Sequence, residues 1–223
     1  MYTALDPTPA EAPPPREMNV SDLSFFAPGA RQEEKAAALQ EAQGVVRLVQ
    51  VYCSRDPAWS LELLQRAAPT VERLEVLSPR EPHLRAVLAM PRLRRLFVWG
   101  DDGLDAAPPE LGALPPGHSG LRWLSVRDLP RATLQSLLQA HRGTLEELEL
   151  MVGTPGTWEW PRSCRDLHSL LGRCGLRALR RLVLLRLYFS HTACREQLAA
   201  VRAALPGLQV LCGKCDDVPP EPL

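Results

Sequence analysis

The chain has 223 residues, of which 45% are apolar and 23% charged, and its 26 basic side chains balance its 26 acidic ones. These values predict a soluble globular protein with a substantial core. A net charge of zero argues against nucleic acid as a general partner, and no segment approaches the roughly 18 apolar residues of a membrane span. Six cysteines and no apolar leader segment predict reduced thiols in a cytoplasmic or nuclear protein.

The first 43 residues carry no repeated pattern. Residues 1–30 contain six prolines and predict a disordered amino-terminal tail. Residues 31–43 are rich in Ala, Glu and Gln and end before Gly44, which predicts a short helix. We expect this helix to cap the repeat domain that follows over residues 44–215, because the end of a repeat array must hide its apolar face. Residues 216–223 are expected to form a carboxy-terminal tail.

From residue 44 onward a short apolar phrase, L-x-x-L-x-L, returns along the chain. Six copies and a degenerate seventh at 208–211 have a leucine at their fourth position: Leu48, Leu74, Leu96, Leu124, Leu148, Leu182 and Leu211. Successive copies are 26, 22, 28, 24, 34 and 29 residues apart. This phrase at intervals of about 20–29 residues is typical of the leucine-rich repeat solenoid. The predicted fold class is therefore α/β, a horseshoe of about six or seven irregular repeats with a parallel inner sheet and outer helices.

Amphipathic segments between the phrases predict the outer helices. Asp56 before Pro57 is typical of a helix N-cap followed by proline in the first turn. Ser163 with Asp166 three residues later resembles a capping box that opens another helix. Residues 100–120 contain two Pro-Pro pairs and predict irregular chain in place of a helix.

The residues between the leucines of each phrase are expected to face the concave side of the horseshoe. Neighbouring strands would then present Phe97, Trp99 and Trp123, flanked by arginines and followed by acidic residues. The predicted partner-binding surface comprises Arg73, Arg95, Phe97, Trp99, Trp123, Arg127, Glu147 and Glu149. Aromatic residues and arginine are enriched in binding hot spots, so we expect a protein partner of unknown identity here. The alternative is that the rings only pack on one another and on long loops.

A second candidate surface is the loop of residues 154–161, which carries Trp158 and Trp160. It belongs to the longest repeat, and its two rings would be available to a partner. The sequence equally allows them to cover the edge of the sheet, and both interpretations stay open.

The cysteines form one short motif, Cys212-Gly213-Lys214-Cys215. Zinc normally takes four ligands at characteristic spacings, and the other donors are scattered over neighbouring repeats: Cys164, Cys174, Cys194, His168 and His191. We therefore predict no metal and no cofactor, and keep a zinc- or thiol-dependent protein as the second alternative. No phosphate-binding loop, nucleophile elbow or paired-carboxylate motif is present, so an enzyme is not expected.

Residues from about 45 to 215 resemble the repeat half of F-box/leucine-rich repeat proteins, especially the expanded arthropod-like sets. The resemblance rests on residues 68–74 (APTVERL), 83–87 (HLRAV) with 90–96 (MPRLRRL), and 144–148 (TLEEL). Such relatives are substrate receptors of cullin-RING ubiquitin ligases, which implies that the repeats hold a substrate while an amino-terminal F-box docks the ligase adaptor. Residues 1–43 contain no recognisable F-box. We expect a protein-interaction module, with a receptor whose F-box is lost or degenerate within residues 18–43 as the first alternative.

Overall fold

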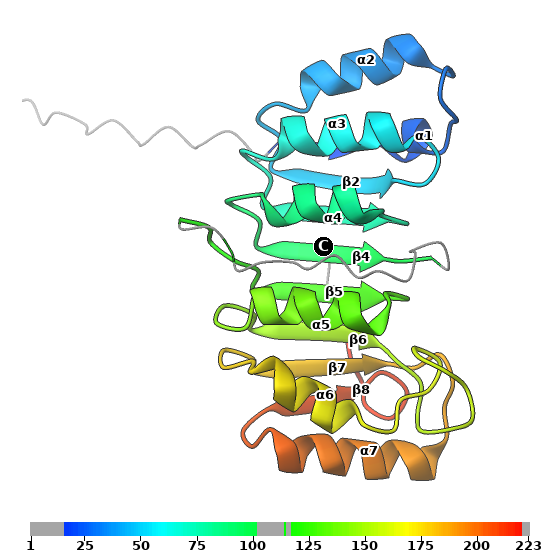
Figure 1. The fold of residues 1–223 in the computed structure, drawn as a ribbon, viewed down its shortest axis with the longest axis vertical. Helices are drawn as coiled ribbons and strands as arrows, with labels where there is room; N and C mark the ends of the chain where they lie inside the picture. Colours follow the sequence, from blue (N-terminus) through cyan, green and yellow to red (C-terminus); the bar gives the residue numbers. More distant parts are fainter. Residues whose placement is uncertain (1–15, 102–113, 115–116, 220–223) are drawn as a thin grey trace, which may run out of the picture.

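The computed structural model describes residues 16–101, 114 and 117–219, which form one parallel β-sheet with helices along one of its faces (Figure 1). The eight strands lie in the order of the chain, so each strand pairs with the ones before and after it. They are β1 (Glu17–Asn19), β2 (Arg47–Tyr52), β3 (Arg73–Leu77), β4 (Arg95–Trp99), β5 (Trp123–Arg127), β6 (Glu147–Met151), β7 (Arg181–Leu185) and β8 (Gln209–Cys212). The sheet is open, and the predicted α/β class is confirmed.

Seven helices connect the strands in the part of the chain that the structure describes. They are α1 (Ser21–Ser24), α2 (Gln32–Glu41), α3 (Pro57–Ala67), α4 (Glu81–Leu88), α5 (Arg131–Ala140), α6 (Leu167–Cys174) and α7 (His191–Ala204). Among the described residues, no helix has the length and apolar character needed to cross a bilayer. The segment 100–120, predicted to be irregular, lies mostly outside the described residues.

Two local predictions about helix starts have opposite outcomes. The Asp56 N-cap is confirmed, because its carboxylate accepts the Trp59 backbone N–H at 3.3 Å at the start of α3. The capping box at Ser163 is wrong. Its hydroxyl oxygen instead accepts the backbone N–H of Gly156 at 2.8 Å, within the preceding loop, and α6 begins at Leu167 without a side-chain cap. Ser163 lies four residues before α6 begins, too far away to cap its first turn, and its hydroxyl stabilises the loop instead.

Two rows of buried apolar side chains cross the sheet on its helix-covered side. Cross-strand pairing aligns Leu48, Leu74, Leu96, Leu124, Leu148, Leu182 and Val210 in the first row, and Val51, Val76, Val98, Val126, Leu150, Leu184 and Cys212 in the second. Removal of these side chains from water is the main force holding sheet and helices together, at roughly 25 cal/mol per Å² of apolar area.

The seventh phrase is shifted by one residue from the predicted alignment. Val210, and not Leu211, pairs with Leu182. Because side chains alternate between the two faces of a strand, a shift of one residue exchanges the faces. Cys212 therefore enters the second core row beside Leu184 and is fully buried.

The prediction of a disordered tail over residues 1–30 does not hold for residues 16–30; residues 1–15 lie outside the described part. Glu17–Asn19 adds a short parallel strand to β2, and the Glu17 carboxylate pairs with Arg47 at 2.8 Å. Met18 packs against the core. A strand of three residues has too few alternating positions to give a periodic signal, and the nearby prolines dominate the composition.

Helix α2 falls within the range predicted for the capping helix and is tied to α3 by a buried ion pair. Lys35 Nζ lies 2.7 Å from Asp56 Oδ2, with both side chains almost inaccessible to solvent. The same ammonium group donates to the carbonyl oxygens of Phe26 and Ala27. The Trp59 indole donates in turn to the Lys35 carbonyl oxygen at 3.1 Å. Helix α2 is thus joined to the first full strand–helix unit by polar contacts as well as by burial.

Candidate protein-interaction surface

The face of the sheet that the helices leave uncovered, called the open face below, carries the predicted site residues. Along the edge where the strands begin, cross-strand neighbours form a row of mostly charged side chains: Arg47, Arg73, Arg95, Trp123, Glu147 and Arg181. The next row contains Glu75, Phe97, Ser125, Glu149 and Val183. The phrase spacing therefore assigned the predicted residues to the correct face of the sheet.

The predicted aromatic cluster is not exposed in the expected way. Trp123 is only 3% exposed and Phe97 only 8%. The Arg95 guanidinium lies 4.6 Å from the centroid of the Trp123 ring, and that of Arg127 lies 4.9 Å from the centroid of Phe97. Guanidinium groups stack favourably on aromatic rings, so these arginines cover the rings and present their own charge to solvent. The idea of three exposed aromatic side chains lying next to one another is corrected to a layer of arginine over aromatic.

Trp99 is the exception, because 40% of its surface is exposed at the carboxyl end of β4. Its indole Nε1 donates to Asp128 Oδ2 at 3.1 Å, and the Arg127 guanidinium lies 5.5 Å from its ring. One edge of this ring is thus fixed, one face is near Arg127, and only its exposed part is open to solvent.

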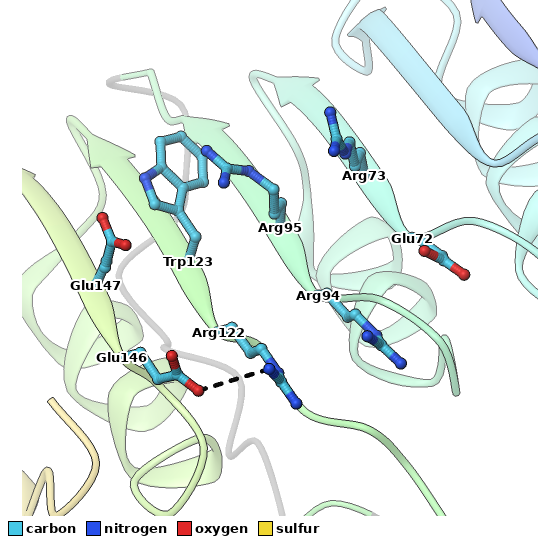
Figure 2. A pocket seen from close by; sticks show the side chains of 8 residues that line it. All are labelled: Glu72, Arg73, Arg94, Arg95, Arg122, Trp123, Glu146 and Glu147. Atoms are coloured by element: carbon cyan, nitrogen blue, oxygen red, sulfur yellow. Dashed lines mark ion pairs between the residues drawn. The ribbon is translucent and has the colours of Figure 1, made fainter. Parts of the chain in front are cut away.

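A cavity of about 330 Å³ opens on the open face at the edge where strands β3 to β6 begin. Figure 2 shows its lining, which comprises Glu72, Arg73, Arg94, Arg95, Arg122, Trp123, Glu146 and Glu147. Four arginines against three glutamates give the lining a formal charge of +1 (4 − 3). Arg122 is 3.8 Å from Glu146, and Glu147 is paired at 3.1 Å with Arg181, which lies outside the lining. Arg73 and Arg94 are exposed and form no ion pair with any described residue.

Four residues of this lining were not among the predicted site residues: Glu72, Arg94, Arg122 and Glu146. Each stands at the second position of its phrase, one residue before the strand begins. The alternation rule for strands does not apply before the first paired residue, so the pattern left their direction undefined. The available signal was that this position is charged in five successive phrases, the fifth being that of Arg180.

In the loop of residues 154–161, one tryptophan is exposed and the other is packed against the core. Trp158 is 56% exposed and stacks on Tyr188 with 5.5 Å between ring centroids. Trp160 is half-buried against the core, and its Nε1 donates to the Leu129 carbonyl oxygen at 2.8 Å. Trp160 therefore packs against the core, and Trp158 is exposed to solvent. A shallow cavity of about 460 Å³ lies between this loop and Asp128, the acceptor of the Trp99 indole.

Arg131 at the start of α5 holds this loop from the helix side. Its guanidinium lies 5.9 Å from the Trp160 ring and donates to the Asp166 carboxylate. The hydrogen bond from Arg131 lowers the pKa of Asp166 below its ordinary value. The ion pair is partly exposed and so contributes at most about 1 kcal/mol to stability, but it joins the start of α5 to the N-cap residue of α6 just after this loop.

Comparisons of the chain with family models, with curated proteins and with solved structures each found no significant match.

Proposed function

We propose that the chain is a leucine-rich repeat protein-interaction module whose open face is concave and binds an acidic segment of a partner protein. The repeated L-x-x-L-x-L phrase and a parallel sheet in chain order support the leucine-rich repeat assignment. A broad sheet face without covering helices supports a binding role, since repeat proteins use such extended surfaces for recognition.

The observation that carries the proposal is the group of arginines around the 330 Å³ cavity. Arg73 and Arg94 are exposed and unpaired among the described residues, and Arg95 is held flat over Trp123. A guanidinium group binds a carboxylate with two parallel hydrogen bonds, and such charge-assisted pairs are about twice as strong as neutral ones. Arg95, which is held in place beforehand, loses little side-chain entropy on binding. An acidic side chain of a partner is the ligand that this lining accommodates best.

The charge of the open face changes sign along the sheet, and this change would orient a bound partner segment. Arg73 and Arg95 stand on β3 and β4, whereas Glu147 and Glu149 follow on β6, where Glu147 is paired with Arg181 of β7. A partner segment with an acidic part followed by a basic part would match both ends. Complementary charge of this kind sets orientation and association rate more than it sets affinity.

The test is partner capture with a charge-reversed open face. The tagged full chain and the double variant Arg73→Glu with Arg94→Glu are compared in affinity purification with quantitative mass spectrometry. The matched control is Arg66→Glu with Arg85→Glu, which makes the same charge change on α3 and α4 at the helix side. Loss of an arginine at a hot spot costs on the order of 2 kcal/mol, so a specific partner should fall by at least about 30-fold.

Capture of the same proteins in equal amounts by the open-face variant would contradict the proposal. Equal loss in both double variants would show that net charge alone, and not the open face, governs capture. Binding that depends on the arginines should also weaken as salt is raised, because exposed charges are screened.

The ubiquitin-ligase receptor stays the alternative, and its adaptor contact would have to use residues 18–43. These residues are built into the domain, since β1 pairs with β2 and Lys35 of α2 pairs with Asp56. Phe25 and Phe26 are exposed in the same segment and offer apolar area to an adaptor. Recovery of a cullin-ligase adaptor that is lost in Phe25→Ser with Phe26→Ser would make the receptor role primary.

A further inference from the structure

Three cysteine side chains meet at the carboxy-terminal end of the sheet, where α7 packs beside β8 (Figure 1). Cys194 lies on α7, Cys212 ends β8, and Cys215 lies in the turn that follows. Cys194 Sγ is 3.6 Å from Cys212 Sγ and 4.0 Å from Cys215 Sγ, and all three sulfur atoms lie within 4.8 Å of one another. Among the described residues this is the one group of three or more His, Cys, Asp or Glu side chains with such proximity.

The backbone holds this arrangement. Cys212 occupies a position of the second core row, so its side chain points toward α7 and the helix-covered side. The chain then turns sharply, because the backbone N–H groups of Cys215 and Asp216 both donate to the Cys212 carbonyl oxygen, at 3.1 and 2.9 Å. The Asp216 carboxylate accepts the Cys212 N–H at 2.7 Å and closes the turn. The turn thus brings the thiols of Cys212 and Cys215 to the same side, where both lie near the thiol of Cys194 on α7.

The distances fit a tetrahedral metal. A zinc–sulfur bond of about 2.3 Å places two sulfur ligands roughly 3.8 Å apart at the tetrahedral angle. Two of the three separations, 3.6 and 4.0 Å, lie on either side of that value, and the third is within 4.8 Å. The other sequence candidates do not join the group. The Cys164 thiol contacts Asp166, and the Cys174 thiol donates to the Leu170 carbonyl oxygen.

A buried arginine next to the group supplies a second observation. Arg186 is only 8% exposed, and its guanidinium contacts Cys194 Sγ at 3.3 Å, Gln197 Oε1 at 2.6 Å and the Val152 carbonyl oxygen at 3.3 Å. No carboxylate of the described residues lies within ion-pair distance of it. Arginine stays protonated in proteins, and a buried charge without a counter-charge is unfavourable. An anionic group beside Cys194 would remove that cost.

We propose that Cys194, Cys212 and Cys215 bind a zinc ion through three sulfur atoms, with Arg186 as the counter-charge. Three thiolates and one divalent ion carry a net charge of −1, which the guanidinium balances. Zinc replaces the thiol protons, so binding releases protons to solvent. Cys215 is exposed, and the fourth coordination position on its side is taken by water. The ion ties α7 to the strand and turn that end the sheet, and so caps the last repeat.

The experiment uses the reduced, purified full chain, loaded with zinc and desalted, with metal content measured by mass spectrometry. The expected result is about one equivalent of zinc per chain. Cobalt(II) added to the metal-free chain should give intense visible bands of a tetrahedral site and a thiolate-to-metal charge-transfer band. Cys215→Ala is the cleanest variant, because this side chain is exposed and its removal leaves the core unchanged. Cys174→Ala removes a buried thiol outside the group and is the control for the buried Cys194 and Cys212, with circular dichroism checking that each variant is folded.

Cys215→Ala, with Cys194→Ala and Cys212→Ala as further variants, should reduce retained zinc to background, while Cys174→Ala keeps the wild-type amount. Arg186→Gln should lower zinc affinity about 10–100-fold, as loss of a group that supports a ligand usually does. The proposal is overturned if the reduced wild-type chain retains no more zinc than Cys215→Ala, or if Cys174→Ala loses zinc to the same degree. Partner capture on the open face does not enter this readout, so the two proposals fail independently.

Discussion

Arg95 on β4 lies with its guanidinium 4.6 Å from the ring centroid of Trp123, its direct neighbour on β5. This contact decides the chemical character of the open face. A tryptophan that could have offered apolar surface is buried, and a planar cation is held above it. The surface available to a partner at this point is therefore one of oriented hydrogen-bond donors, supported from below by an aromatic ring.

The first prediction compares two tryptophans on the same face. Trp123→Ala should lower the free energy of unfolding by about 3–5 kcal/mol, because a large buried ring is replaced by a cavity. Trp99→Ala should cost only about 1 kcal/mol, because Trp99 is 40% exposed. Urea unfolding at neutral pH measures both values. Equal losses in the two variants would mean that the two rings are equally buried.

The second prediction concerns the buried ion pair between α2 and α3. Lys35→Met should lower the free energy of unfolding by about 3–5 kcal/mol, because it leaves the Asp56 carboxylate buried without its partner. Arg66→Met is the control, since it removes the exposed Glu62–Arg66 pair on α3 and should cost less than about 1 kcal/mol. Chemical denaturation distinguishes the two, and similar losses would contradict the burial of Lys35.

The third prediction is a pH dependence of stability caused by His141. Burial lowers the pKa of this side chain from 6.5 to about 4, and its Nδ1 accepts the Leu121 backbone N–H at 3.1 Å. The folded chain therefore binds a proton less readily than the unfolded chain. Stability is fully present above about pH 6.5 and decreases as the pH falls toward about 4, by on the order of 3 kcal/mol in total.

His141→Asn keeps an acceptor near the position of Nδ1 but does not titrate in this range. Its free energy of unfolding should be less dependent on pH between about 6.5 and 4 than that of the wild type. His83, whose pKa is also lowered by burial, stays in the variant and accounts for a remaining slope. Parallel pH profiles of the two chains, measured by denaturant unfolding, would count against a neutral His141 in the folded state.

The fourth prediction uses two glycines, Gly153 directly before the loop of residues 154–161 and Gly156 within it. A Cβ added at Gly153 would lie 1.7 Å from the Arg162 carbonyl oxygen, whereas at Gly156 the nearest atom would be 3.7 Å away. Gly153→Ala must therefore move the loop backbone and should cost more than about 2 kcal/mol, with increased exposure of Trp160. Gly156→Ala should stay within about 1 kcal/mol. Thermal unfolding with tryptophan fluorescence reports both, and an undisturbed Gly153→Ala would refute this close approach.

The sequence predicted the sheet from β2 to β8 well because its phrase repeats at each of these strands. The positions of Leu74, Leu96 and Leu124 follow from burial alone, since apolar side chains at these spacings can share one core only in parallel register. The alignment at the end of the pattern was wrong. Leu211 matches the phrase better than Val210 does, so the register of β8 was predicted one residue away from that in the structure.

The candidate sites were harder to predict because each depends on contacts between separate elements. Alternation along a strand gives the face of Trp123 but says nothing of the long side chain that covers it. Likewise, the three cysteines are brought together by the packing of α7 beside β8, and no spacing in the sequence encodes that packing. Residues 16–30 were missed because a three-residue strand has no period of its own.

The strict chain order of the strands also has a consequence for how the molecule folds and opens. Each strand touches only strands that are adjacent along the chain, so an ordered segment can form in the middle and grow outward one unit at a time. The two ends are then the first parts to open. A ligand bridging β3 to β6 would hold the centre of such an array. Hydrogen exchange would be fastest at the two ends: at β1, and at β8 when no zinc ion joins it to α7.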